Sequence, residues 1–162
     1  MAGAVVMMTK GKSNPLEIGA ELPQARAQNQ DGELVSLGEF DRGYVMVYFY
    51  PKADTPGCTK QACSLRDSFS DLTDHGVKVF GVSGDSVKSQ LEFQKEYNLP
   101  FDLLADTDGR VAKAFGVPMR LTKFPARQAF LFEDGKLIWK DLEASTEEQA
   151  SDVLAVLSKE NR

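Results

Sequence analysis

The chain has 162 residues, of which 42% are hydrophobic and 27% are charged, and its formal net charge is −5. This length allows one domain with a sizeable core, and the composition is ordinary for a soluble globular protein. Because no strongly basic segment is present, the sequence excludes nucleic acid and anionic membranes as expected partners.

The N-terminal residues carry no targeting signal that we recognise. Their apolar stretch is short and has no positively charged residue before it, whereas a signal peptide needs both a basic start and a longer apolar region. No stretch approaches the roughly 18 apolar residues that a membrane span needs. We expect residues 1–14 to be loosely ordered, residues 15–162 to form a single domain, and the protein to be cytoplasmic.

The first predicted elements are two strands. Residues 30–33 read Gln-Asp-Gly-Glu, which is typical of a turn, and residues 34–37 after it predict an edge strand. Residues 44–50 form an unbroken run of aromatic and β-branched residues, which indicates a strand buried on both faces of a central sheet. Pro51 ends this strand because proline cannot donate a hydrogen bond to the ladder.

The middle of the chain alternates between helical and strand patterns. An amphipathic helix is predicted over residues 59–74, where apolar residues recur three or four positions apart: Ala62, Leu65, Phe69 and Leu72. A strand over residues 77–82 follows. Asp85 is then expected to cap a helix that carries Val87, Leu91 and Tyr97 on one side.

The last third of the chain predicts further strands and helices. Residues 101–104 indicate a short strand and residues 109–115 a short helix, and residues 128–139 form a hairpin with Gly135 in its turn. The final helix begins near Ser145, which has capping-box spacing to Glu148, and its apolar stripe consists of Ala150, Val153, Leu154 and Leu157. This alternation predicts an α/β fold with helices on both faces of a sheet.

Metal sites are not expected. Zinc requires about four ligands, and the chain offers only two cysteines and one histidine, His75, which suits a helix C-terminus better than catalysis. Asp106–Gly109 resembles the middle of a calcium loop, but Leu104 and Phe115 stand where the first and last carboxylates belong. We therefore predict a turn with a helix cap at this position.

The two cysteines, Cys58 and Cys63, are close together in sequence, which favours redox chemistry over a secreted disulfide scaffold. Pro56 and Gly57 shape a tight loop, so Cys58 is predicted in the first turn of a helix. Amides in a first turn lack intrahelical partners and carry positive partial charge, so they stabilise the nucleophilic thiolate. Thr55 lies close enough for its hydroxyl to donate to the sulfur or to accept a hydrogen bond from a peroxide.

Helix geometry tests whether the two sulfurs can join. Five residues along a helix place the Cα atoms of Cys58 and Cys63 roughly 8 to 9 Å apart, whereas a disulfide requires less than about 7 Å. Two alternatives remain open. Either Cys63 is a small core residue beside Ala62 and Leu65 that never bonds Cys58, or the first turns of the helix unwind after Cys58 is oxidised.

The stretches Phe49-Tyr50-Pro51-Lys52, Thr55-Pro56-Gly57-Cys58-Thr59 and Ala62-Cys63 closely resemble the atypical two-cysteine peroxiredoxins of the bacterioferritin-comigratory, or Q, type. The resemblance covers about residues 16–158. It implies a thioredoxin-like fold, with a central mixed sheet flanked by helices and an N-terminal β-hairpin. It also implies a monomer without metal or other cofactor.

The resemblance further implies a thiol peroxidase acting on hydrogen peroxide and organic hydroperoxides. Cys58 would be the peroxidatic cysteine and Cys63 the resolving cysteine, and a thioredoxin-type reductant would reopen their disulfide. Thr55 would hydrogen-bond the peroxide, and Pro51 would shield the sulfur from water. The alternatives are a thiol–disulfide oxidoreductase, which normally uses a Cys-x-x-Cys spacing, and a non-enzymatic redox sensor.

An arginine completes the site that the resemblance implies. Arg127 matches the family's arginine at the start of a late strand, where its cation would hold Cys58 as a thiolate and polarise the peroxide. Arg120 is the fallback because the segment between Val117 and Arg127 is shorter than in many members. Gln61 stands where the family commonly has a glutamate.

Overall fold

The computed structural model describes residues 16–121 and 124–160 of the chain. The prediction that residues 1–14 are loosely ordered lies outside these residues. Within them, no helix combines the length and the apolar character needed to cross a membrane.

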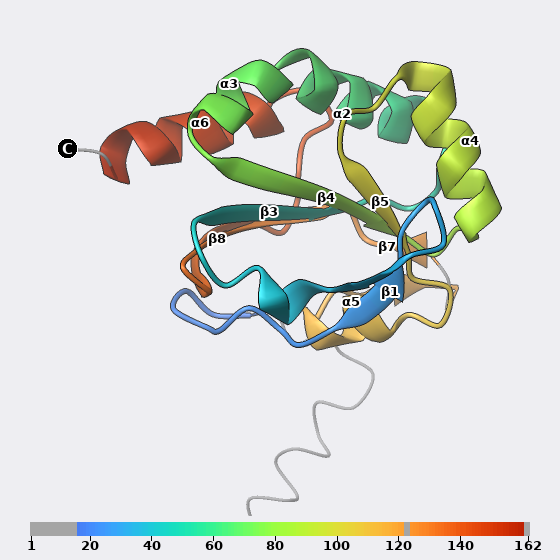
Figure 1. Ribbon diagram of the computed structural model, residues 1–162, viewed down its shortest axis with the longest axis horizontal. Helices are drawn as coiled ribbons and strands as arrows, with labels where there is room; N and C mark the ends of the chain where they lie inside the picture. The colour runs from blue at the N-terminus through green and yellow to red at the C-terminus, as the bar shows by residue number, and fades with distance from the viewer. Residues whose placement is uncertain (1–15, 122–123, 161–162) are drawn as a thin grey trace, which may run out of the picture.

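A seven-stranded mixed sheet runs through the centre of the fold, in the order β2-β1-β5-β4-β3-β8-β9 (Figure 1). β3 pairs in parallel with β4, and β4 with β5, whereas the remaining pairs are antiparallel. The strands are β1 (Arg26–Gln28), β2 (Leu34–Ser36), β3 (Tyr44–Phe49), β4 (Val77–Ser83), β5 (Asp102–Ala105), β8 (Gln128–Glu133) and β9 (Lys136–Asp141). The structure confirms the edge strand, the central strand and the N-terminal hairpin.

Helices cover both faces of the sheet, as predicted (Figure 1). One face carries α2 (Pro56–Asp67), α3 (Phe69–Asp74), α4 (Val87–Tyr97) and α6 (Gln149–Glu160). The other carries α5 (Arg110–Ala114) and the 3₁₀ turn η1 (Leu37–Glu39). A two-stranded ribbon of β6 (Met119–Arg120) and β7 (Phe124–Pro125) precedes β8. Each face buries its own apolar cluster, and Cys58 belongs to the cluster beneath α2 and α6.

The single helix predicted over residues 59–74 is two helices. α2 begins three residues earlier, at Pro56, and Ser68, with φ −103° and ψ 10°, separates it from α3. The apolar spacing gives no sign of the break because Leu65 and Leu72 enter the same core on either side of it.

The prediction that Asp85 caps α4 is wrong. Ser86 is the N-cap, and its hydroxyl accepts a hydrogen bond from the Ser89 amide at 3.2 Å. Asp85 instead accepts from the Ala53 amide at 2.7 Å, which ties the loop after β3 to the end of β4. A carboxylate satisfies a buried loop amide here, while the next residue serves the helix.

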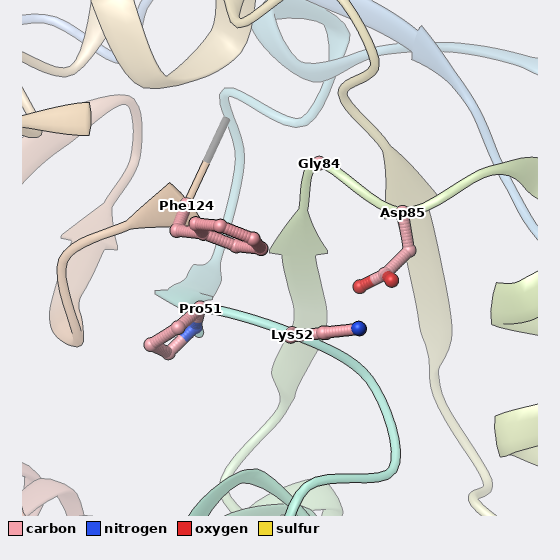
Figure 2. A pocket seen from close by; sticks show the side chains of 5 residues that line it. All are labelled: Pro51, Lys52, Gly84, Asp85 and Phe124. Atoms are coloured by element: carbon pink, nitrogen blue, oxygen red, sulfur yellow. The ribbon is translucent and has the colours of Figure 1, made fainter. Parts of the chain in front are cut away.

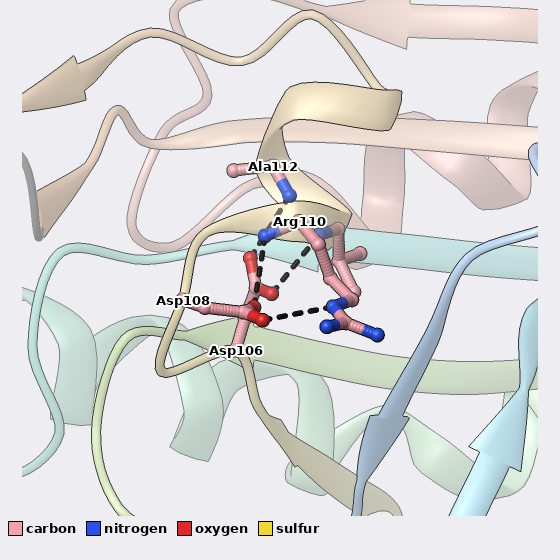
Figure 3. A network of polar contacts seen from close by, with 5 residues as sticks. Asp106, Asp108, Arg110 and Ala112 are labelled. Carbon is pink, nitrogen blue, oxygen red and sulfur yellow. Dashed lines mark hydrogen bonds and ion pairs between the residues drawn. The ribbon is translucent and has the colours of Figure 1, made fainter.

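Asp106 caps α5, as predicted for the calcium-like segment (Figure 3). Its two carboxylate oxygens accept from the amides of Val111 and Ala112, each at 2.9 Å, and Asp108 pairs with Arg110. In residues 16–121 and 124–160, no group of three or more histidine, cysteine or acidic side chains is arranged to hold a metal ion.

The buried carboxyl of Asp106 leads us to predict how the stability of the fold depends on pH. Burial raises the pKa of the Asp106 carboxyl above its ordinary value of 3.8, while the amides of Val111 and Ala112 act in the opposite direction. The folded state therefore binds the carboxyl proton of Asp106 more tightly than the unfolded state does. The contribution of the carboxyl to stability is full below pH 3.8 and is lost as the pH rises through the folded pKa.

We expect the free energy of unfolding of the wild type, minus that of Asp106→Asn, to decrease as the pH rises from 3.8 through the acid range. Denaturant titrations of both proteins at a series of pH values measure this difference. A difference that stays constant or grows with pH would contradict the account of Asp106.

Candidate active site

Cys58 lies in the first turn of α2, directly after the loop that leaves the central strand β3. Thr55 is the N-cap residue, with an extended backbone at φ −97° and ψ 155°, and Pro56 follows at the first helical position. Proline suits this position because it has no amide to leave unpaired and its φ is already helical. The Cys58 side chain is 1% exposed, so its sulfur lies at a helix start within the core.

The hydroxyl of Thr55 does not cap α2. It donates to the Lys52 carbonyl at 2.7 Å and not to the sulfur of Cys58, so of the two alternatives from sequence the donation to sulfur is wrong. The first helical bond of α2 joins the Thr59 amide to the Thr55 carbonyl at 2.8 Å. Amides earlier in the turn have no intrahelical carbonyl to bind, and they carry the positive end of the helix dipole.

Arg127 provides the cation next to Cys58. Its Nη2 atom donates to the Cys58 sulfur at 3.5 Å. Strand register explains the contact, because Gln128 at the start of β8 pairs with Phe49 at the end of β3. Arg127 therefore lies where the chain leaves β3 toward Cys58. Arg120 lies on β6 with an exposed side chain, so the structure brings Arg127, and not the fallback residue, to the sulfur.

Gly57 allows the guanidinium to approach this closely. A Cβ atom at position 57 would lie 3.0 Å from Nη2 of Arg127, which is tighter than ordinary van der Waals contact. A side chain at position 57 would therefore require the guanidinium to shift by a few tenths of an ångström.

A chain of buried amide side chains extends from Arg127 into the C-terminal helix. Arg127 Nη1 donates to Gln61 Oε1, and Gln61 Nε2 donates to Gln149 Oε1 at 2.9 Å. Gln61 and Gln149 are 1% and 2% exposed. Sequence reasoning missed this chain, although Gln149 lies four residues before Val153 and therefore on the apolar stripe of α6. A polar residue on a buried stripe was the available signal.

The aromatic neighbours of the sulfur are neutral. Tyr48 and Tyr50 belong to the same core cluster as Cys58 and are fully buried. Burial raises the pKa of both phenols above the ordinary value, so both stay protonated at neutral pH. They therefore add no negative charge that would compete with a thiolate at Cys58.

The loop between β3 and α2 is held by buried polar contacts. Besides the bond from Ala53 to Asp85, the Tyr50 hydroxyl donates to Gln90 Oε1 at 2.6 Å, and Gln90 Nε2 donates to the Ser83 hydroxyl and the Leu104 carbonyl. Sequence analysis did not identify Gln90. It is a buried residue of α4 and faces the core of the protein where Leu91 was expected.

Pro51 lines a small hollow beside this loop, of about 170 Å³ (Figure 2). The Lys52 ammonium and the Asp85 carboxylate point toward each other across it, and the Phe124 ring lies near Pro51. Pro51 is thus at the surface of the loop that leads to Cys58, and the hollow offers both apolar and charged walls.

Cys63 is half-buried, and both cysteines are free thiols. Cys63 is not a member of the buried cluster that contains Ala62 and Leu65, so it is not simply a core residue. It lines a shallow surface hollow of about 380 Å³ together with Lys60, Ser64, Asp67, Ser68 and Glu147. Both cysteines lie within the continuous helix α2, so helical geometry keeps their Cα atoms roughly 8 to 9 Å apart.

Residues 60–64 of α2 also hold the segment that leads into α6. Lys60 Nζ pairs with the Glu147 carboxylate at 3.1 Å, and the Ser64 hydroxyl donates to the Glu147 carbonyl at 2.9 Å. With the bond from Gln61 to Gln149, these contacts join α2 to the start of α6. Unwinding α2 between the cysteines would break the contacts of Lys60 and Gln61, whereas that of Ser64 lies beyond Cys63.

Known proteins are similar to this chain in sequence and in fold. Residues 18–140 match the AhpC/TSA family. Over 121 residues the chain is 44% identical to a putative chloroplastic peroxiredoxin Q of Oryza sativa subsp. indica, covering 74% of this chain and 56% of that protein. A putative peroxiredoxin bcp of Coxiella burnetii is 45% identical over 109 residues, covering 67% of this chain and 72% of that protein.

The crystal structure of peroxidoxin BcpB from Mycobacterium tuberculosis matches with a TM-score of 0.82 and 31% identity, covering 89% of this chain and 97% of that one. This match confirms the predicted thioredoxin-like fold. The chain spans only 56% of the length of the rice relative. The AhpC/TSA family matches more than half of this chain, and the two relatives above are named peroxiredoxin Q and peroxiredoxin bcp. The chain therefore belongs to the AhpC/TSA family, as a peroxiredoxin of the Q and bcp type.

Proposed function

We propose that the protein is a thiol peroxidase that reduces hydrogen peroxide and organic hydroperoxides through Cys58. The observation that carries this proposal is the buried sulfur at the start of α2 with the Arg127 guanidinium 3.5 Å away. A helix start and a cation both favour a thiolate, which is the nucleophilic form of cysteine. The names of the relatives, which are peroxiredoxins, support the same function.

In the first step the Cys58 thiolate attacks one oxygen of the peroxide. A sulfur–oxygen bond forms, the oxygen–oxygen bond breaks, and the departing oxygen takes up a proton and leaves as water or an alcohol. Cys58 becomes a sulfenic acid, so the sulfur loses two electrons and the peroxide gains them. Arg127 donates hydrogen bonds only. It can therefore stabilise the thiolate and then the charge that develops on the leaving oxygen.

Thr55 and Pro51 take supporting roles in this proposal. The Thr55 hydroxyl donates its hydrogen bond to the Lys52 carbonyl, which leaves its oxygen able to accept a hydrogen bond from the peroxide. Pro51 lies at the surface of the loop before Cys58, where its ring limits the access of water to the sulfur.

In the second step Cys63 attacks the sulfenic sulfur, a disulfide forms and water leaves. Because an intact α2 keeps the two cysteines too far apart for a disulfide, the helix must unwind between them. The unwinding breaks the contacts of Lys60 with Glu147 and of Gln61 with Gln149, whereas the bond of Ser64 lies beyond Cys63. These are few bonds at one helix end, where local opening is least costly.

A dithiol reductant of the thioredoxin type then closes the cycle by thiol–disulfide exchange. One of its thiolates attacks the disulfide, its second thiolate displaces the protein, and the reductant leaves as a disulfide. The spacing of Cys58 and Cys63 argues against the alternative of a thiol–disulfide oxidoreductase, because the second sulfur is out of reach in the intact helix.

The proposal extends to the setting of the reaction. We propose that residues 15–162 form one domain, since both apolar clusters pack against the same sheet. We also propose that the reaction needs no metal or other cofactor, because sulfur alone carries the electrons. We place the protein in the cytoplasm, because a reducing compartment keeps both thiols free. A monomer is proposed from the family resemblance alone.

The two cysteines have different predicted roles, which single substitutions separate. Cys58→Ser should abolish peroxide consumption because the nucleophile is lost. Cys63→Ser should consume one equivalent of peroxide and then stall as a Cys58 sulfenic acid. Stopped-flow measurement of peroxide consumption, with and without thioredoxin and its reductase, tests both expectations.

Mass spectrometry of the peroxide-treated wild type should find Cys58 joined to Cys63. If Cys63→Ser turns over with thioredoxin as the wild type does, the resolving role of Cys63 is wrong. Rapid oxidation of Cys58→Ser would be incompatible with the peroxidatic role of Cys58. Slow oxidation of the wild type without turnover would favour a redox sensor.

Replacing Arg127 by methionine should slow the reaction of Cys58 with peroxide by about a hundredfold, the typical cost of losing a donor to developing negative charge. Arg120→Met is the matched control because it removes the same charge from an exposed residue of β6. Its rate constant should equal that of the wild type. Equal losses in both variants would show that net charge, and not the contact with Cys58, sets the rate.

A further inference from the structure

We propose that Gln149 of α6 is a positioning residue for the peroxide reaction, because it fixes the direction in which Gln61 faces Arg127. The inference rests on the proposed function and adds a residue from the C-terminal helix to that site. It concerns a side chain that contacts neither Cys58 nor Arg127 directly and acts through Gln61 alone.

The guanidinium dictates the direction of the amide chain. Arginine has donors and no acceptor, so Gln61 must turn its Oε1 atom toward Arg127. A half-turn of the Gln61 amide would place its NH₂ group against the guanidinium, with donor facing donor. Gln61 then could not hold Arg127, and the guanidinium would lose its anchor on the side away from the sulfur.

Gln149 prevents that half-turn. Its Oε1 atom accepts from Gln61 Nε2 at 2.9 Å, a bond that exists only while Gln61 presents its own oxygen to Arg127. The opposite orientation of Gln149 would again set donor against donor. Within the described part of the chain, Gln149 Nε2 is buried and has no hydrogen-bond partner. The side chain thus leaves its NH₂ group without a partner while its oxygen accepts from Gln61.

The backbone of α6 keeps Gln149 in place. Val153 and Leu157, one and two turns further along, are fully buried in the cluster that contains Cys58. Before the helix, Glu147 is held by Lys60 and Ser64 of α2. The Gln149 amide therefore reaches Gln61 from a fixed support, which a positioning residue requires.

A pair of variants separates positioning from simple packing. Gln149→Met has a similar size but no oxygen acceptor, whereas Gln149→Glu keeps an acceptor oxygen whether its carboxyl is charged or protonated. Gln30→Met is the matched control: Gln30 is a buried glutamine in the turn after β1 that binds Asp102 and the Leu103 amide, far in sequence from both α2 and α6.

The measurements are the rate constant of the first peroxide reaction by stopped flow and the ultraviolet absorbance of the thiolate at neutral pH, both in a Cys63→Ser background. We expect Gln149→Met to react about tenfold or more slowly, since a small displacement of a catalytic group has effects of this order. Its thiolate absorbance should also fall. Gln149→Glu should restore at least half of the lost rate, and Gln30→Met should match the wild type in both readouts.

Several outcomes would overturn the inference. A Gln149→Met rate equal to that of the wild type does so and leaves the proposed function intact, as does an equal loss in Gln149→Met and Gln149→Glu. A wild type that does not react with peroxide overturns both together. If Gln149→Met fails to fold, as judged by circular dichroism, Gln149→Ser carries the same expectation because its short side chain cannot reach Gln61.

Discussion

The start of α2 places two opposite requirements on Cys58. The free amides of the first turn and the Arg127 guanidinium stabilise the sulfur only while α2 is helical from Pro56 onward. The same helix keeps Cys63 beyond the reach of a disulfide. Reaction with peroxide and disulfide formation therefore need two conformations of one short segment, and the rest of the fold either supports the helix or limits how far it opens.

Distant parts of the chain build the reactive conformation. The antiparallel register of β3 and β8 brings Arg127 next to the loop before Cys58, and Gly57 leaves room for its guanidinium. Gln61 holds the other side of the guanidinium and is itself bound by α6. Because Gln61 lies between the two cysteines, unwinding α2 would release Arg127 from its anchor in the same step that would bring Cys63 to the sulfur in the proposed cycle.

Local signals in the sequence predicted much of this arrangement. Pro56 and Gly57 placed Cys58 in the first turn of a helix, although the helix itself begins at Pro56, and the apolar run of β3 located the central strand that leads to it. A turn with a helix cap over residues 106–109 also followed from local spacing. These features depend on neighbouring residues alone, so sequence patterns carry them.

Contacts between distant residues could not be predicted in the same way. The bond from Gln61 to Gln149 depends on how α6 packs against α2, and Asp85 serves the Ala53 amide and not its own helix because β4 ends beside that loop. The break at Ser68 changes the direction of the chain without changing which residues are apolar. Composition and periodicity do not indicate how distant elements pack against each other.

Hydrogen–deuterium exchange of α2 tests the requirement for two conformations most directly. In the reduced protein the amides of residues 59–63 should be protected, as expected for helical bonds such as that of Thr59 with Thr55. After one equivalent of peroxide has joined Cys58 to Cys63, these amides should exchange rapidly while those of β3 stay protected. An unchanged, protected helix in a protein that contains this disulfide would contradict the account.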